Sequence, residues 1–236
     1  MIKRIYESLA SLSLGLWLMG GVMVLLAAGS FGGEAAASLN EMPLFAWLGS
    51  APFSVSWWLW GTLGLLALLV VNTLFCSVEA IRLRYGKAGL VALLAPQLMH
   101  AGFLLIVLAH LLSAKGGAKQ AMQLFEGSDL SFPGGGSVVV EAIEVESDHR
   151  GMPLDYRARM RVVEQGRSTL VTVRPNEPLF HGGLGIYLKY AEPAPVPAAF
   201  VEIHREPGAG WALAGALLFT VGNGMLLAVR RERRPA

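Results

Sequence analysis

The chain has 236 residues, of which 54% are hydrophobic and only 15% are charged, and its mean hydropathy is +0.51. Soluble domains carry about 25% charged residues, so this composition argues against an ordinary soluble enzyme. The net charge of +2, without a basic patch interleaved with aromatic residues, argues against nucleic-acid binding. The single cysteine, Cys76, excludes an internal disulfide, a CxxC redox pair and a cysteine-based zinc site.

Four uncharged apolar runs are each long enough to cross a bilayer, which takes about 20 residues. They occupy residues 8–30, 55–76, 90–114 and 210–229. A secretory signal is the alternative for the first run, because it follows two basic residues and ends in small ones. Its apolar core is longer than the roughly 7–15 residues of a signal, and three further runs follow it. The sequence therefore predicts four transmembrane helices in a lipid bilayer.

Basic residues predict the orientation, because Lys and Arg remain on the cytoplasmic side. Nine of them fall on one side if the chain crosses four times (Lys3, Arg4, Arg82, Arg84, Lys87, Arg230, Arg231, Arg233, Arg234). The loop 31–54 carries only the acidic residues Glu34 and Glu41. Both termini and the loop 77–89 are therefore expected in the cytoplasm, and residues 115–209 outside it.

Aromatic and small residues within the runs predict where the helices meet lipid or protein. Trp57, Trp58 and Trp60 at the second run, and Trp211 at the fourth, are typical of an interfacial aromatic belt. The fourth run carries small residues and an amide (Gly210, Ala214, Gly215, Gly222, Asn223, Gly224). Small side chains let helices approach closely, so this run is expected to pack against protein. Asn72 is expected to form an interhelical hydrogen bond.

Between the third and fourth runs the hydropathy pattern changes to period two, which is typical of strands. Four residues of one such segment share a single face (Tyr156, Ala158, Met160, Val162). Residues 143–146 alternate in the same way. Further strands are expected at 168–174, 184–191 and 198–204, separated by turns rich in Gly and Pro.

These features together predict a membrane α plus β protein. Four transmembrane helices are expected, with one extracytoplasmic β-rich, sandwich-like domain inserted between helices 3 and 4. That domain comprises residues 115–209. The first membrane part, residues 1–114, holds helices 1–3 with the outer loop 31–54 and the cytoplasmic loop 77–89. Residues 210–236 hold helix 4 and a basic cytoplasmic tail.

Motifs of common enzymes are absent from the sequence: it has no hydrolase elbow, P-loop, Rossmann fingerprint or HExxH helix. The arginines on the second face of the 156–162 segment (Arg157, Arg159, Arg161) could bind carboxylates, although such a row is more often a solvated strand face. Exposed polar positions in turns and strands explain three of the histidines (His149, His181, His204).

His100 is the most informative candidate for chemistry. It lies about ten residues into the third run, which at 1.5 Å per residue places it roughly 15 Å deep, near the bilayer midplane. An ionisable side chain at that depth is costly and indicates a functional site. The alternative is a neutral histidine that is hydrogen-bonded to a neighbouring helix, and the spacing does not choose between the two.

His110 follows ten residues later, about 15 Å further along the helix, so the two histidines cannot ligate the same metal ion. A position near the outer interface, where its polar tip reaches water, explains it most simply. If both histidines face a partner protein, they mark two levels of one pathway.

Several stretches, in order and over nearly the whole chain, resemble the ResB family of cytochrome c biogenesis proteins, called CcsB in haem-delivery pairs. In the membrane part the likeness lies in SWWLWGTLGLLALLVVNTLFCSVEAIR, MHAGF and the closing EPGAGWALAGALLFTVGNGMLLAVRRERR. In the outer domain it lies in FEGSDLSFPGG, GMPLDYRARMRVVEQG and VRPNEPLFHGGLGIYLKY. The outer domain is shorter than in many family members, and the partner's tryptophan-rich motif ending in Trp-Asp is absent.

The resemblance implies a subunit of a cytochrome c synthase (haem lyase) complex in a bacterial cytoplasmic (inner) membrane. Such a subunit is not expected to be catalytic without its partner. Such a subunit works with a CcsA-type partner, shares haem b with it, and presents the haem for attachment to CxxCH apocytochrome c. His100 matches the family's transmembrane haem ligand and is the expected iron ligand, with His110 as a second cofactor-binding residue.

Two other functions are compatible with parts of the sequence. One is a non-catalytic scaffold that stabilises the partner and docks apocytochrome without contacting haem. The other is a thiol reductase for the apocytochrome, which fits poorly because Cys76 stands alone at the cytoplasmic end of its helix.

Overall fold

The structure is a computed structural model that describes residues 2–33, 38–40, 42–87, 89–132, 135–193 and 195–232. Glu34, Glu41, Arg233 and Arg234, which entered the predicted topology, lie outside these residues. The chain divides into two compact units. The membrane unit comprises Met1–Lys115 and Gly208–Ala236, and the β unit comprises Gly116–Pro207.

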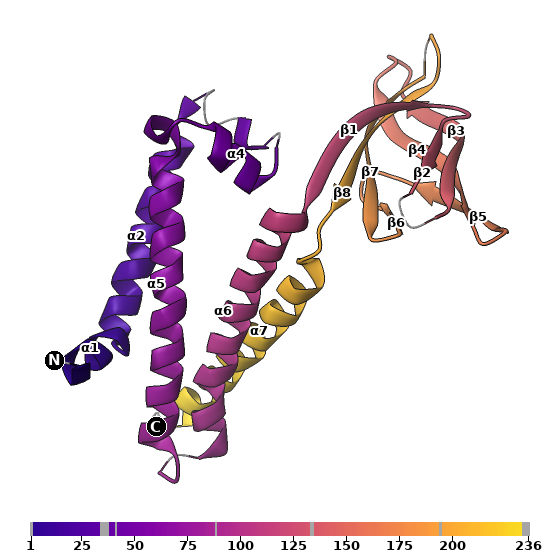
Figure 1. The fold of residues 1–236 in the computed structure, drawn as a ribbon. Coiled ribbons are helices and arrows are strands. Elements are labelled where there is room, and N and C mark those ends of the chain that lie inside the picture. Colours follow the sequence, from indigo (N-terminus) through magenta and orange to yellow (C-terminus); the bar gives the residue numbers. More distant parts are fainter. Residues whose placement is uncertain are drawn as a thin grey trace. The chain divides into compact units, whose positions relative to one another are not determined.

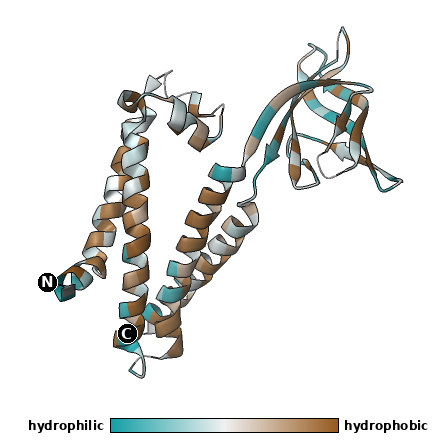
Figure 2. Ribbon diagram, viewed as in Figure 1, coloured by the Kyte–Doolittle hydropathy of each residue, from teal (hydrophilic) through white to brown (hydrophobic). Residues whose placement is uncertain are grey.

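The membrane unit consists of helices α1 (Ile2–Leu9), α2 (Leu12–Ser30), α4 (Leu44–Ser50), α5 (Phe53–Arg84), α6 (Leu90–Gly116) and α7 (Ala209–Glu232), with the short 3₁₀ helix η1 (Ser38–Asn40) (Figure 1). Four of them, α2, α5, α6 and α7, are long and apolar enough to cross a membrane, and apolar residues dominate them in Figure 2. A helix pairs its own backbone N–H and C=O groups, and this is required in a bilayer because lipid tails offer them no hydrogen-bond partners. The prediction of a multi-pass membrane protein is thus confirmed.

The first apolar run is broken near its start, where a single helix from residue 8 was expected. Helix α1 ends at Leu9, α2 begins at Leu12, and the Asn72 side-chain amide donates to the carbonyls of Leu9 (2.6 Å) and Ser11 (3.0 Å). The carboxamide therefore binds the Leu9 carbonyl at the break and shares the Ser11 carbonyl with the backbone amide of Gly15, which lies 3.2 Å from it. Asn72 is 3% exposed, and the predicted interhelical hydrogen bond of this residue is present.

The segment expected as an outer loop contains the helix α4, which begins directly after Pro43 and ends before Ala51. Its Trp47 is buried against Trp58 of α5, with ring centroids 6.5 Å apart. Trp58 is only 8% exposed, so its assignment to an interfacial belt was wrong. Trp57 and Trp60 are 45% and 50% exposed, as that belt requires.

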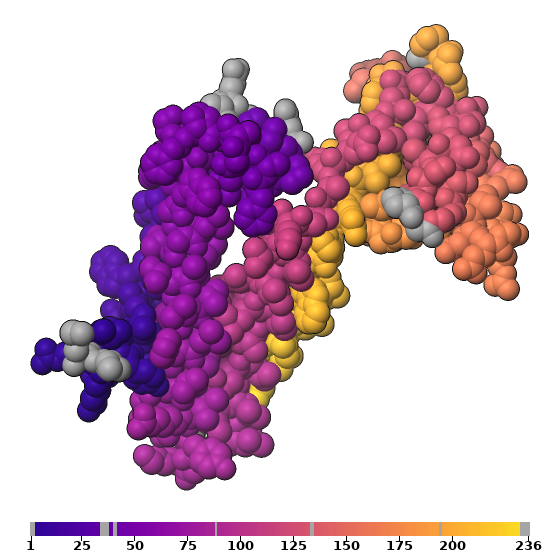
Figure 3. Space-filling model, in the orientation of Figure 1, coloured from indigo at the N-terminus to yellow at the C-terminus, as the bar shows by residue number. Residues whose placement is uncertain are grey.

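Helix α5 has 32 residues and continues through Arg84, so the first eight residues of the predicted loop 77–89 are helical. At 1.5 Å per residue it is roughly 48 Å long, against about 30 Å for the hydrocarbon core. Figure 3 shows α5 and α6 in contact near the turn that joins them and separated toward their far ends.

Helices α6 and α7 pack closely because glycines face each other. A Cβ atom placed on Gly102 would lie 2.6 Å from the carbonyl oxygen of Gly215, and one placed on Gly215 would lie 2.7 Å from that of Gly102. A Cβ on Gly222 would lie 2.8 Å from the carbonyl oxygen of Ala95. The fourth span therefore packs against protein, as its small residues predicted, and the protein is α6 of the same chain.

The β unit follows α6 and precedes α7 along the chain, and its described residues form eight strands in two antiparallel sheets. One sheet has the order β1 (Ala118–Phe125), β8 (Ala198–Arg205), β7 (Leu184–Glu192), β6 (Leu179–His181). The other has the order β2 (Asp129–Ser131), β3 (Ser137–Ser147), β4 (Pro153–Glu164), β5 (Arg167–Val173). One apolar core draws on both sheets, so they pack face to face as a sandwich.

The alternation along β4 is confirmed in three dimensions. Ala158 and Met160 are fully buried in the core, and Tyr156 and Val162 pack against it. Two-residue turns with positive φ close two of the hairpins, at Gln165-Gly166 between β4 and β5 and at Gly182-Gly183 between β6 and β7. Positive φ at both turn positions matches the twist of paired strands, and glycine adopts it at little cost.

Candidate functional site

His100 is the central residue of the candidate site. It lies on α6, half-buried, and its Nδ1 is 2.8 Å from the Ser77 hydroxyl oxygen on α5. The same hydroxyl lies 2.9 Å from the carbonyl oxygen of Thr73, one turn earlier on α5. Only one other hydrogen bond joins α5 to α6 in the described part of the chain, from Arg84 Nη1 to the carbonyl of Ala92 (3.4 Å).

The Ser77 contacts favour one position for the ring proton of His100. A hydroxyl has one hydrogen, and the Thr73 carbonyl can only accept. Both contacts are satisfied when Ser77 donates to Thr73 and His100 Nδ1–H donates to Ser77. The neutral ring then keeps its lone pair on Nε2, and this form can ligate a metal.

His110 lies ten residues further along α6 and is exposed. Its Nδ1 is 2.8 Å from the carbonyl oxygen of Ile106 on the same helix, so this nitrogen is the donor. The two histidines thus lie at two levels of one helix, about 15 Å apart by helical rise.

Gln97 was missed by the sequence analysis. It precedes His100 by three residues, a spacing that puts both on one face of α6, and its Nε2 is buried without a hydrogen-bond partner in the described part of the chain. An amide within an apolar run was the available signal. The polar character of this face therefore extends one turn from His100 toward the start of α6.

Among the described residues, no group of three or more His, Cys, Asp or Glu side chains could hold a metal ion. A single neutral imidazole nitrogen is nevertheless the donor that haem iron accepts at an axial position. The donor chemistry at His100 therefore fits a ligand of haem iron.

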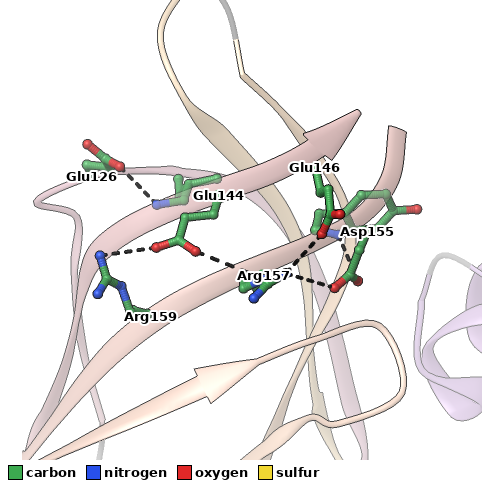
Figure 4. A network of polar contacts seen from close by, with 8 residues as sticks. Glu126, Glu144, Glu146, Asp155, Arg157 and Arg159 are labelled. Carbon is green, nitrogen blue, oxygen red and sulfur yellow. Dashed lines mark hydrogen bonds and ion pairs between the residues drawn. The ribbon is translucent and has the colours of Figure 1, made fainter. Parts of the chain in front are cut away.

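The arginines of β4 are paired with carboxylates of the same sheet (Figure 4). Arg159 lies 3.1 Å from Glu144, and Arg157 lies 3.3 Å from Glu146 and 3.4 Å from Asp155. Arg161 pairs with Glu141, the extra residue of a β-bulge in β3. The row is therefore the solvated, internally neutralised face of a strand, and such exposed pairs stabilise the fold little.

The other histidines are held by local contacts in the β unit. His204 lies between Glu202 (3.2 Å) and Glu206 (3.4 Å), and His181 packs on Phe132 with ring centroids 5.2 Å apart. A hydrogen bond from Lys119, 3.1 Å away, is the main cause that lowers the pKa of Glu202. His149 is exposed in a turn.

A surface pocket of about 350 Å³ lies in the β unit at the β4 and β5 ends. Its lining is mixed in charge (Leu154, Asp155, Tyr156, Arg174, Pro175, Asn176, Glu177). Asp155 is already paired with Arg157, so the acidic and basic groups offer no net preference for a charged ligand.

Four apolar helices and a two-sheet β unit define the class: a multi-pass membrane protein of α plus β architecture. The ResB-like family model matches residues 79–194, from the last turns of α5 through α6 and strands β1 to β7. The match confirms the resemblance to the ResB family that the motifs indicated, and it supports involvement in cytochrome c biogenesis.

Among curated proteins, none matches the sequence. Among solved structures, a cytochrome c heme lyase CcmF superposes with a TM-score of 0.47 and 15% sequence identity, over 87% of this chain and 34% of that one. The chain thus spans about a third of the length of that protein.

Proposed function

We propose that this chain is a membrane subunit of a c-type cytochrome maturation complex. It acts with a CcsA-type partner to carry haem b across the membrane and to present it to apocytochrome c. The ResB-like match over residues 79–194 supports this role, and the observation that carries it is the 2.8 Å contact between His100 Nδ1 and the Ser77 hydroxyl inside an apolar helix.

In this proposal His100 Nε2 would hold the haem iron together with a ligand from the CcsA-type partner. When bound, the haem supplies the group that becomes covalently attached to the apocytochrome. The surrounding apolar helix residues keep water from the iron, which limits side reactions. His110 marks a second level of the same pathway, nearer the outer surface.

The proposed orientation places both termini in the cytoplasm and the β unit, predicted as residues 115–209, outside the bacterial cytoplasmic membrane. Lys3 and Arg4 on α1, Arg82 and Arg84 at the end of α5, and basic residues in the last turn of α7 support it. His100 is the eleventh residue of α6, so helical rise puts it about 15 Å from the helix start.

The test is a visible spectrum of the chain co-purified with its partner. We expect a haem band that is lost or shifted in His100→Ala and restored by added imidazole, which replaces the missing ring. His149→Ala, in an exposed turn, is the matched control and should leave the band unchanged. His110→Ala should keep the iron spectrum and slow delivery to the apocytochrome.

An unchanged spectrum in a folded His100→Ala complex would show that the ligand assignment is wrong. The scaffold function would then be favoured, with the β unit docking apocytochrome and no haem contact by this chain. Deletion of residues 115–209 should in that case abolish maturation without changing the spectrum. Removal of a ring also leaves a cavity, so folding is checked separately by thermal unfolding in detergent.

A further inference from the structure

The hydroxyl of Ser77 occupies a fixed place on α5. It is anchored by its 2.9 Å bond to the Thr73 carbonyl, and Thr73 is 6% exposed with its own hydroxyl bonded to the Leu69 carbonyl at 2.7 Å. Two successive side chains on one helix face are therefore tied to the backbone one turn before them. An acceptor held in this way has little freedom to follow a moving partner.

This fixed acceptor is 2.8 Å from His100 Nδ1, on the neighbouring helix. If Nδ1 lost its proton, Ser77 would have to turn its single hydrogen from Thr73 to His100, and the contact with the Thr73 carbonyl would be lost. The arrangement therefore favours the proton on Nδ1 and the lone pair on Nε2. Metal-bound histidines usually donate their other ring N–H in this manner, which sets the tautomer and the ring orientation.

We propose that Ser77 is a positioning residue for His100: it fixes the ring orientation and tautomer so that Nε2 is presented to an iron centre. The inference rests on the proposed function, in which His100 holds haem iron, and it deepens that function by naming the side chain behind the ligand. Ser77 lies two residues before the segment that the ResB-like model matches, so the geometry alone carries the assignment.

The first readout needs no haem. In the full chain, labelled with ¹⁵N-histidine and held in lipid, the two ring nitrogens of His100 have different NMR shifts when protonated and unprotonated. Subtraction of the spectrum of His100→Gln assigns them. The wild-type chain is expected to show a protonated Nδ1, and Ser77→Ala a mixture of both tautomers.

Two variants separate positioning from a general loss of folding. Ser77→Thr keeps a hydroxyl at the same place and should retain the wild-type tautomer. Thr73→Val removes the neighbouring buried hydroxyl but keeps the carbonyl that anchors Ser77, so it should retain that tautomer as well. An unchanged tautomer in Ser77→Ala would overturn the proposal, whatever happens to haem.

The second readout is the haem-loaded complex. Loss of a partner behind a metal ligand typically weakens metal binding about 10–100-fold, and it makes the ligand less basic. Ser77→Ala should therefore release haem at lower imidazole concentrations and have a higher reduction potential than wild type, with Ser77→Thr and Thr73→Val near wild type. If His100→Ala abolishes the haem band while Ser77→Ala leaves affinity and potential unchanged, the positioning role is refuted and the proposed function stands. If the wild-type complex has no haem band, the proposed function fails, and the iron-directed role of Ser77 fails with it.

Discussion

Different interactions stabilise the interior of each of the two units. Seven of the nine largest fully buried side chains among the described residues belong to the β unit (Val138, Val140, Met160, Val173, Ile186, Leu188, Val201). The membrane unit contributes Trp47 and Ser56 to that set, and its helices meet through glycines and through side-chain bonds to backbone carbonyls. Lipid is as apolar as leucine, so apolar burial drives association of helices only weakly there. A buried apolar side chain therefore contributes more to stability in the β unit than between helices of the membrane unit.

The largest expected effect is in the core of the β unit. Met160→Ala removes a fully buried side chain, and such truncations cost about 2–5 kcal/mol of unfolding free energy. Amide hydrogen exchange of β3 and β4, measured on the full chain in detergent, would report the loss. Leu170→Ala, at a position that is 53% exposed on β5, should change exchange little. Similar losses for both would mean that burial does not govern the stability of this unit.

A smaller loss, about 1–3 kcal/mol, is expected where α6 meets α7. Gly102→Leu places atoms against the backbone of Gly215, which cannot move aside as a side chain would. Thermal unfolding in detergent is the measurement. Gly224→Leu is the control, because no atom lies within 4 Å of the Cβ it would add. Equal destabilisation by both substitutions would contradict close glycine packing as the source of α6–α7 association.

Asn72→Leu should cost less again, about 1 kcal/mol, because polar contacts between membrane helices average near that size. The Leu9 carbonyl would lose the Asn72 donor and the Ser11 carbonyl would keep only the amide of Gly15, so the amides at the junction of α1 and α2 should exchange faster. Asn223→Leu removes an amide that bonds within its own helix, to Phe219, and should leave that junction protected. Unchanged exchange in Asn72→Leu would show that the break is held by other contacts.

The smallest effect is a pH dependence in the β unit. The pKa of Glu202 is lowered chiefly by Lys119, from an ordinary value of about 4.5. The ionised carboxylate therefore adds stability above pH 4.5, and this contribution is lost as the pH falls through the lowered pKa, since the unfolded chain binds the proton first. Hydrogen exchange of β7 and β8 at pH 3 to 6 would measure it. Glu202→Gln should make this exchange less dependent on pH. A pH dependence as steep as that of the wild type would assign it to another group.

Local composition was sufficient to predict the four spans and the two-residue period of β4, because both depend on neighbours within one element. The break at Leu9–Leu12 depends on Asn72, some sixty residues away, and the burial of Trp58 depends on α4 and on Gly29 of α2. Such contacts leave no periodic signal. Strand β1 was missed because its residues do not alternate, and its pairing with β8 stabilises it.

The candidate site could be predicted only as far as its first residue. A histidine near the midplane of an apolar run was visible in the sequence, and so was its depth. Ser77 was not, since a serine near a helix end has many explanations and its contact with His100 joins two helices. The position of the ring proton is inferred from that contact. His100 itself could therefore be found from the sequence, but the nitrogen that it offers to a metal could not.

The junction between α6 and α7 has a consequence for how the protein can be modified. The backbone amide of Gly208 donates to the Ser113 hydroxyl at 3.2 Å, and a Cβ on Gly208 would run into the carbonyl of Ala109. The chain thus leaves the membrane unit and returns to it at one point. We expect that the intervening residues can be exchanged for a short turn without separating the two helices. The β unit can therefore be altered in a variant while the membrane helices stay the same.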